Sequence, residues 1–217
     1  SRLRAAKPMC DAKSMRQRAI SFLITLCALA LAATGAAAQT PVDLELVLAV
    51  DVSRSMDVEE QRIQREGYVA AFRHPDIIDA VRSGPLGRIA VTYFEWAGPS
   101  DQATVVVPWT IVASAADAEA FADQLGTASR ARLPGTSISG AMAQAGGLFG
   151  LVYRGYRQAV DISGDGPNNS GMPVEPARDR LVAQGVTING LPIMLNKVSA
   201  LGYGGIPNLD RYYQDCV

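Results

Sequence analysis

The stretch that decides the fold class is Leu44–Ser55, with the sequence LELVLAVDVSRS. Its first seven residues form a nearly unbroken apolar run of strand length, which is typical of a parallel strand buried on both faces. The run ends at Asp51, where the polar pattern D-x-S-x-S begins. We therefore expect a buried central strand whose carboxyl end carries Asp51, Ser53 and Ser55.

Segments typical of strands and of helices alternate along the rest of the chain. Further strands are expected at residues 88–96, 104–109, 158–162 and 186–193. Helices are expected at residues 57–73, 77–81, 114–125, 136–152, 174–184 and 210–216. This alternation predicts an α/β fold with a doubly wound, mainly parallel sheet flanked by helices. Such sheets normally close with a final strand and a covering helix, so we expect these C-terminal elements to be truncated at Val217.

The first 38 residues have the composition of an export signal. They hold six of the 20 basic residues and one of the 21 acidic ones, with a basic segment at 15–18 before an apolar run at 19–33. Ala36-Ala37-Ala38 then matches the small-residue cleavage pattern. The apolar run, about 15 residues long, is shorter than the roughly 20 that a spanning helix needs. We expect residues 1–38 to be a secretory signal peptide of the Gram-negative type, with an over-called start before Met15, and 39–217 to be a periplasmic or secreted domain.

Residues 39–217 carry 14 basic and 20 acidic residues, a net charge of −6. A domain with this balance lacks the basic stripe that a phosphate backbone requires, so we expect no nucleic-acid partner. Its one cysteine, Cys216, cannot form an internal disulfide, so the fold must rest on its core. No run in this part of the chain is long enough to predict a membrane span.

Three polar segments follow expected strands or precede a helix: D-x-S-x-S at 51–55, Pro134-Gly135-Thr136-Ser137, and Ser163-Gly164-Asp165-Gly166. Because ligands of open parallel sheets bind outside the carboxyl ends of the strands, we expect the three segments to meet. Their oxygen donors favour Mg²⁺, with Mn²⁺ or Ca²⁺ as alternatives, over zinc or copper. Each segment alone could merely cap a helix or form a turn. Together they predict a metal site formed by Asp51, Ser53, Ser55, Thr136 and Asp165.

These residues resemble the metal-ion-dependent adhesion site (MIDAS) of von Willebrand factor type A (vWA) domains in order and spacing. The resemblance covers residues 43–194. It implies that Ser53 and Ser55 coordinate the ion directly, that Thr136 does so directly or through water, and that Asp51 and Asp165 act mostly through water. The phrases DVSRSMD, GTSIS and DISGDGPNN are similar to a secreted bacterial branch known only as a domain of unknown function.

The third segment departs from the family pattern. Gly164 stands where the family usually has Thr or Ser, and Asp161 places an acidic side chain inside the strand. Asp161 is either a buried carboxylate with satisfied hydrogen bonds or a group that supports the metal ligands, and we favour the first interpretation. Asn168-Asn169-Ser170 matches a glycosylation sequon that we expect to be unused.

Two functions from different classes are compatible with such a site. In a binding module, few formal charges around the cation leave it electrophilic, so it accepts an Asp or Glu carboxylate from a protein partner. The alternative is a metal-dependent hydrolase, for example a phosphatase with Asp51 as its nucleophile. That chemistry usually needs a second Asp at position 53, which is Ser here, and a lysine for the phosphate, for which Lys197 is the only candidate in 39–217. We therefore expect a binding module and not an enzyme.

Overall fold

The strand β1 (Thr40–Asp51) lies at the centre of the sheet and has a parallel partner on each side. On one side it pairs with β2 (Ile89–Trp96), which pairs in turn with the antiparallel β3 (Thr104–Val112). On the other side it pairs with β4 (Tyr153–Gly164), which is parallel to β5 (Val186–Pro192). The resulting order, β3-β2-β1-β4-β5, confirms the expected mainly parallel sheet with residues 104–109 on an edge strand.

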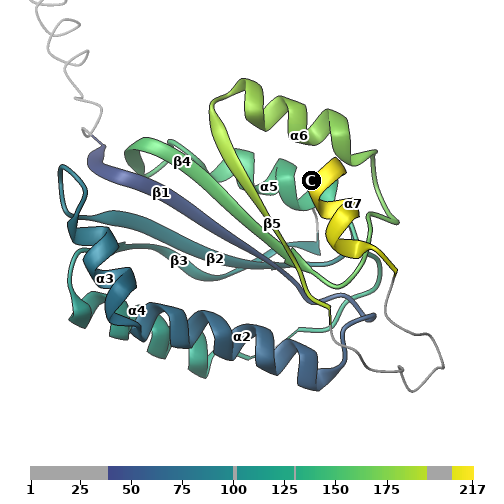
Figure 1. Cartoon of the computed structure of the whole chain (residues 1–217), viewed down its shortest axis with the longest axis horizontal. Helices are drawn as coiled ribbons and strands as arrows, with labels where there is room; N and C mark the ends of the chain where they lie inside the picture. The colour runs from purple at the N-terminus through teal and green to yellow at the C-terminus, as the bar shows by residue number, and fades with distance from the viewer. Residues whose placement is uncertain (1–38, 100–101, 130, 195–206) are drawn as a thin grey trace, which may run out of the picture. The chain divides into compact units, whose positions relative to one another are not determined.

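The computed structural model describes residues 39–99, 102–129, 131–194 and 207–217; the expected signal peptide lies outside the described residues. Six helices in this part of the chain cover both faces of the sheet (Figure 1). One face carries α2 (Val58–Arg73), α3 (Pro75–Arg82) and α4 (Ala115–Thr127). The other carries α5 (Ile138–Leu148), α6 (Val174–Ala183) and α7 (Leu209–Cys216).

The alternation of side chains along β1 divides the core into two layers. Leu48 and Val50 pack with residues of α2, α3 and α4, including Phe72. Val47 and Ala49 point to the opposite face, into a cluster with α5, α6 and α7. Burial of each large apolar side chain contributes about 1.5–3 kcal/mol, so both faces of β1 hold the fold together. A strand buried on both faces explains why its sequence is almost continuously apolar.

Local signals set most of the element boundaries. Asp57 caps α2 in a capping box with Glu60, and Ser114 caps α4. Gly185, with φ of +82°, follows α6 at the position expected from the sequence. The expected helix at 136–152 is shorter than predicted, because Ser137 caps α5 and its regular turns end at Leu148.

The amino-terminal half of β4 is the largest difference from the sequence expectation. The strand begins at Tyr153 instead of residue 158, and its first residues pair with the start of β1 at Thr40. Tyr156 is 65 % exposed, so this half of the strand lacks the apolar pattern by which we predicted strands. Among the described residues, no helix has the length and apolar character needed to cross a membrane.

Candidate metal site

The D-x-S-x-S turn at the carboxyl end of β1 contacts the aspartate that follows β4. Asp51 Oδ1 accepts a hydrogen bond from the backbone N–H of Ser53 at 2.7 Å. Ser55 Oγ donates to Asp165 Oδ1 at 2.8 Å and lies 2.7 Å from Ser53 Oγ. Either hydroxyl can be the donor between Ser53 and Ser55. Four of the five predicted site residues therefore form one connected group.

Thr136 reaches the same edge of the sheet through contacts of its backbone. The preceding segment forms a parallel bridge between Leu133 and Ser53, with the Leu133 N–H donating to Val52 O at 3.0 Å. The Thr136 N–H donates to Asn169 Oδ1 at 2.9 Å, and the Thr136 carbonyl accepts from the Asn169 N–H at 2.9 Å. Thr136 is buried. These contacts hold the second motif segment between the first and the third.

The asparagines after Asp165 have a structural role that the sequence analysis missed. Asn168 Oδ1 accepts from the N–H of Ser139, in the first turn of α5, at 3.2 Å. Gly171 has φ of +80°, and a Cβ there would lie 2.6 Å from Ser137 Oγ, so only glycine fits this approach. The glycosylation sequon at these positions gives no indication of these contacts. The Asp-Gly-Pro-Asn-Asn sequence is also rich in turn residues. That composition could have predicted a loop whose side chains form hydrogen bonds with nearby backbone groups.

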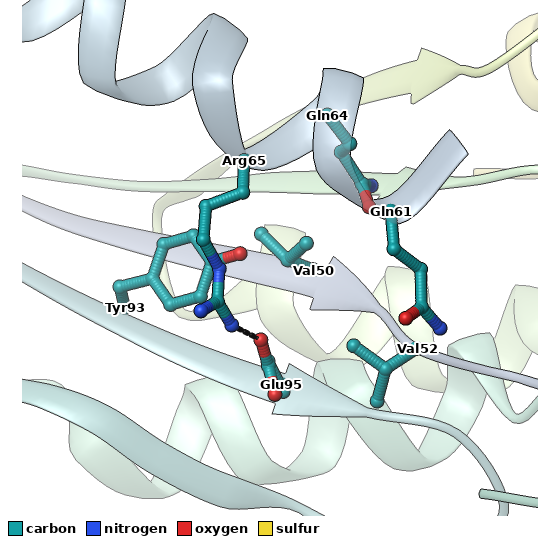
Figure 2. Close-up of a pocket in the computed structure, with 7 residues that line it drawn as sticks. All are labelled: Val50, Val52, Gln61, Gln64, Arg65, Tyr93 and Glu95. Atoms are coloured by element: carbon teal, nitrogen blue, oxygen red, sulfur yellow. Dashed lines mark hydrogen bonds and ion pairs between the residues drawn. The ribbon is translucent and has the colours of Figure 1, made fainter. Parts of the chain in front are cut away.

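Helix α2, which follows the first motif, presents the buried polar side chains of Gln61, Gln64 and Arg65 to the sheet, beside residues of β1 and β2 (Figure 2). Arg65 is buried, forms an ion pair with Glu95 at the end of β2, and donates to the carbonyl of Ala128. Gln64 Nε2 donates to Ser163 Oγ, two residues before Asp165, at 2.7 Å. Breaking a buried ion pair typically costs about 3–5 kcal/mol, so Arg65 holds α2 firmly against the end of β2, while Gln64 joins α2 to the end of β4 that carries the third motif segment.

Asp51 is fully buried, yet one of its two carboxylate oxygens has no hydrogen-bond partner among the described residues. Burial raises the pKa of Asp51 from 3.8 to about 8; the Ser53 N–H lowers this pKa and the nearby Asp165 raises it. Burial also raises the pKa of Asp165, against the effect of the Ser55 hydroxyl. Neither carboxylate has an ion-pair partner in the part of the chain that the structure describes, and a bound cation would stabilise the ionised form of both.

The donor set and its spacing fit a hard divalent cation. Adjacent ligands of an octahedral Mg²⁺ are about 2.9 Å apart when each metal–oxygen distance is 2.0–2.1 Å. The oxygens of Ser53, Ser55 and Asp165 are spaced at 2.7 and 2.8 Å. In the described part of the chain, no three His, Cys, Asp or Glu side chains gather so as to hold a metal. Any ion at this edge would therefore depend on hydroxyl oxygens.

The structure also accounts for the two departures from the family pattern. A Cβ on Gly164 would lie 2.9 Å from Asp51 Oδ2 and 2.7 Å from Tyr213 Oη, so a larger side chain does not fit there. Asp161 is half-buried and accepts a hydrogen bond from Asn189 Nδ2 of β5 at 2.7 Å. Burial raises the pKa of Asp161, and the Asn189 hydrogen bond lowers it. One oxygen of Asp161 thus has a structural hydrogen-bond partner on β5.

Solved structures show that this is a vWA-like fold. Proximal thread matrix protein 1 from the mussel byssus matches with a TM-score of 0.51 and 17 % identity over 72 % of this chain and 39 % of that chain. A structure of the same protein with a zinc-occupied MIDAS motif matches with a TM-score of 0.52 and 14 % identity over 81 % of this chain and 45 % of that chain. The pilus adhesin SpaC from Lactobacillus rhamnosus GG matches with a TM-score of 0.53 and 15 % identity over 81 % of this chain and 27 % of that chain.

This chain thus spans less than half the length of each of these proteins. The family model described as "Protein of unknown function (DUF1194)" matches residues 41–217, and the chain belongs to this family. Curated proteins provide no match to the sequence. The vWA-like fold predicted from the sequence is therefore confirmed, while metal binding at the five site residues stays a prediction.

Proposed function

We propose that this chain is a binding module that holds a divalent cation at the carboxyl ends of β1 and β4 and uses it to bind a protein partner. The partner supplies an Asp or Glu carboxylate to the cation. The observation that carries the proposal is the row of oxygens from Ser53 through Ser55 to Asp165, spaced at 2.7 and 2.8 Å. We propose Mg²⁺ as the ion, with Mn²⁺ or Ca²⁺ as alternatives.

The chemistry of the donors supports a site that needs its partner. Hydroxyls of Ser53, Ser55 and Thr136 carry no formal charge, so the cation keeps most of its positive charge and holds an exchangeable position. Mg²⁺ gives up water reluctantly, so its affinity for the isolated domain is weak. A carboxylate from the partner completes the coordination shell. Cation and partner then tighten each other's binding by the same factor.

Two further lines support this proposal. The similar structures named above are a thread matrix protein and a pilus adhesin, and one of them is described with a zinc-occupied MIDAS motif. The sequence pattern of residues 1–38 supports export to the periplasm or beyond. A binding module also needs no general acid or base, and position 53 is a serine where a phosphatase of this type has its second aspartate.

Titration calorimetry with Mg²⁺, Mn²⁺ and Ca²⁺ tests the metal site. Ser53→Ala removes one ligand and should weaken binding at least tenfold, and Asp165→Asn should weaken it more, because it removes a charge that balances the cation. Ser83→Ala, at the end of α3, and Asp161→Asn, on β4, are matched controls outside the site and should bind like the wild type. Wild-type affinity in Asp165→Asn would contradict the proposed site.

Capture of partners from a periplasmic extract tests the carboxylate step. The wild-type chain should retain a protein in Mg²⁺ and release it in EDTA, and Asp165→Asn should not retain it. Esterifying the carboxylates of the captured protein should abolish its binding. Retention of the same protein in EDTA would refute metal-mediated binding. Metal-dependent turnover of phosphatase substrates that is lost in Asp51→Asn would favour the hydrolase instead.

A further inference from the structure

Helix α7 brings a tyrosine to the candidate metal site from a part of the chain that carries none of the motif residues. Leu209 and Tyr213 lie one turn apart and are the buried residues of this helix. Tyr213 is 3 % exposed and belongs to the same core cluster as Val47 and Ala49 of β1. Its ring therefore lies on the face of the sheet toward which Asp51 also alternates.

Two glycines in adjacent strands make room for this ring. A Cβ on Gly190 of β5 would lie 2.9 Å from Tyr213 Cδ1, so the ring rests against the bare backbone of that strand. A Cβ on Gly164 of β4 would lie 2.7 Å from Tyr213 Oη, so the hydroxyl occupies the space above the second glycine. The tyrosine thus fits a slot that runs from β5 toward the site and ends beside Asp165.

The space above Gly164 is shared by two buried oxygens that lack partners. The same Cβ position lies 2.9 Å from Asp51 Oδ2. Neither Asp51 Oδ2 nor Tyr213 Oη has a hydrogen-bond partner among the described residues. Buried polar atoms without partners are rare and call for an explanation. One of these groups is an acceptor when ionised and the other carries a proton to donate, so they complement each other.

The position of α7 does not depend on the Tyr213 hydroxyl. Tyr212 Oη accepts a hydrogen bond from the Asn168 N–H at 3.1 Å. Arg178 of α6 donates to the carbonyls of Asp215 and Cys216 at 3.1 and 3.2 Å. These contacts, together with the burial of Leu209, hold the helix against α6 and the loop after β4. The hydroxyl of Tyr213 is therefore available for a role at the site.

We propose that Tyr213 is a positioning residue of the metal site. When the cation is bound, the Tyr213 hydroxyl donates a hydrogen bond to Asp51 Oδ2, directly or through one water molecule. Asp51 Oδ1 is already held by the Ser53 N–H, so this second hydrogen bond fixes the orientation of the whole carboxylate beside the ion. The inference rests on the proposed function, because it assigns a supporting group to the same site.

The test is Tyr213→Phe, which keeps the ring in its slot and removes only the hydroxyl. Calorimetry with Mg²⁺ and Mn²⁺ should show affinities at least about tenfold weaker than in the wild type, as for other groups that orient metal ligands. The midpoint of thermal unfolding in EDTA should not fall. Addition of Mg²⁺ to the wild type should change the near-ultraviolet absorption of a buried tyrosine, and this change should be missing in Tyr213→Phe. Tyr156→Phe, with an exposed ring, is the matched control and should behave like the wild type.

The outcomes separate this inference from the proposed function. Wild-type affinity and an unaltered metal-induced tyrosine signal in Tyr213→Phe overturn the inference and leave the metal site standing. Absence of Mg²⁺, Mn²⁺ and Ca²⁺ binding in the wild type overturns both. Weaker binding that is matched by a lower unfolding midpoint in EDTA would show that the hydroxyl supports only the fold, and would also overturn the inference.

Discussion

The central strand β1 carries buried carboxylates at both ends, and the hydrogen bonding of these carboxylates differs between the two ends. Asp43 and Glu45, near the amino end, are both almost fully buried. Their oxygens accept hydrogen bonds at 2.7 to 3.2 Å from backbone N–H groups. The donors are the N–H groups of Leu86, Arg88, Gly150 and Gly155. Each carboxylate thereby joins β1 to a loop beside the sheet.

Asp51, at the carboxyl end, has one oxygen bonded to the Ser53 N–H and one with no partner in the described residues. A buried carboxylate with its hydrogen bonds made stabilises the fold, whereas one left half-satisfied costs free energy. The difference teaches that burial alone does not distinguish a structural acid from a functional one. The partners of each oxygen do, and they favour our proposal that the carboxyl end of β1 is the end that binds a ligand.

The largest effect on stability is expected at Glu45. Its carboxylate accepts hydrogen bonds from the Gly150 N–H at 2.8 Å and from the Gly155 N–H at 2.7 Å. Glu45→Gln keeps the shape but turns one acceptor into a donor that faces a backbone N–H. Because hydrogen bonds to charged groups contribute about 1.5–3 kcal/mol each, the free energy of unfolding should fall by about 3 kcal/mol in urea titrations. Exposed Glu119, changed to Gln, is the control; a loss at Glu45 as small as at Glu119 would contradict the structural role.

A somewhat smaller effect is expected at Asp43, because Asn keeps one acceptor oxygen for the N–H groups of Leu86 and Arg88. Asp43→Asn should lower the free energy of unfolding by about 2 kcal/mol in the same titrations. A Cβ on Gly84 would lie 2.5 Å from Asp43 Oδ2. Gly84→Ala should therefore displace the carboxylate and destabilise the fold without changing any charge. If Gly84→Ala unfolds like the wild type, Asp43 is not held as described.

The gain in unfolding free energy from Mg²⁺ should depend on the carboxylates at the carboxyl end of β1 and not on those at its amino end. At a free concentration ten times its Kd, an ion that binds only the folded chain raises the free energy of unfolding by about 1.4 kcal/mol. The increment should be the same in Asp43→Asn and absent in Asp165→Asn, as measured by thermal unfolding with Mg²⁺ and with EDTA. An equal increment in all three chains would place the ion elsewhere.

The smallest effect on stability is expected at Asp51 itself. In EDTA, Asp51→Asn replaces a buried carboxyl, one oxygen of which has no hydrogen-bond partner among the described residues, so the free energy of unfolding should rise or change by less than about 1 kcal/mol. The measurement is the same urea titration used for Asp43→Asn. A loss of about 2 kcal/mol or more, equal to that at Asp43, would remove the contrast between the two ends of the strand.

The fold could be predicted because its signals are local. The apolar run of Leu44–Val50 indicates a strand buried on both faces, and the residues that cap α2, α4 and α6 are read within one turn of each helix. The polar start of β4 carries no such signal, because its side chains face solvent and its identity as a strand comes only from pairing with β1. Pairing between distant segments is not visible in the local pattern.

The residues at the candidate site also divide into those that the sequence pattern predicts and those that depend on contacts with distant segments. Asp51, Ser53, Ser55 and Asp165 could be predicted to meet, because they follow parallel strands and parallel strands bring their carboxyl ends to one edge. The burial of Arg65 could not be predicted, because a charged residue within a helix is normally exposed, and its partners, Glu95 and the Ala128 carbonyl, come from distant segments. The approach of Tyr213 to the site could not be predicted either, since the space for its ring is made by glycines in two other strands.

The edge strand β3 has one consequence for association with other chains. Its register with β2 shifts beside Tyr93, and Pro108 is exposed there. Proline has no N–H to donate, and the Pro108 carbonyl already accepts from Thr110 Oγ1 at 2.9 Å. An incoming strand would meet no N–H donor at this residue, so the ladder of an added strand would be interrupted at Pro108.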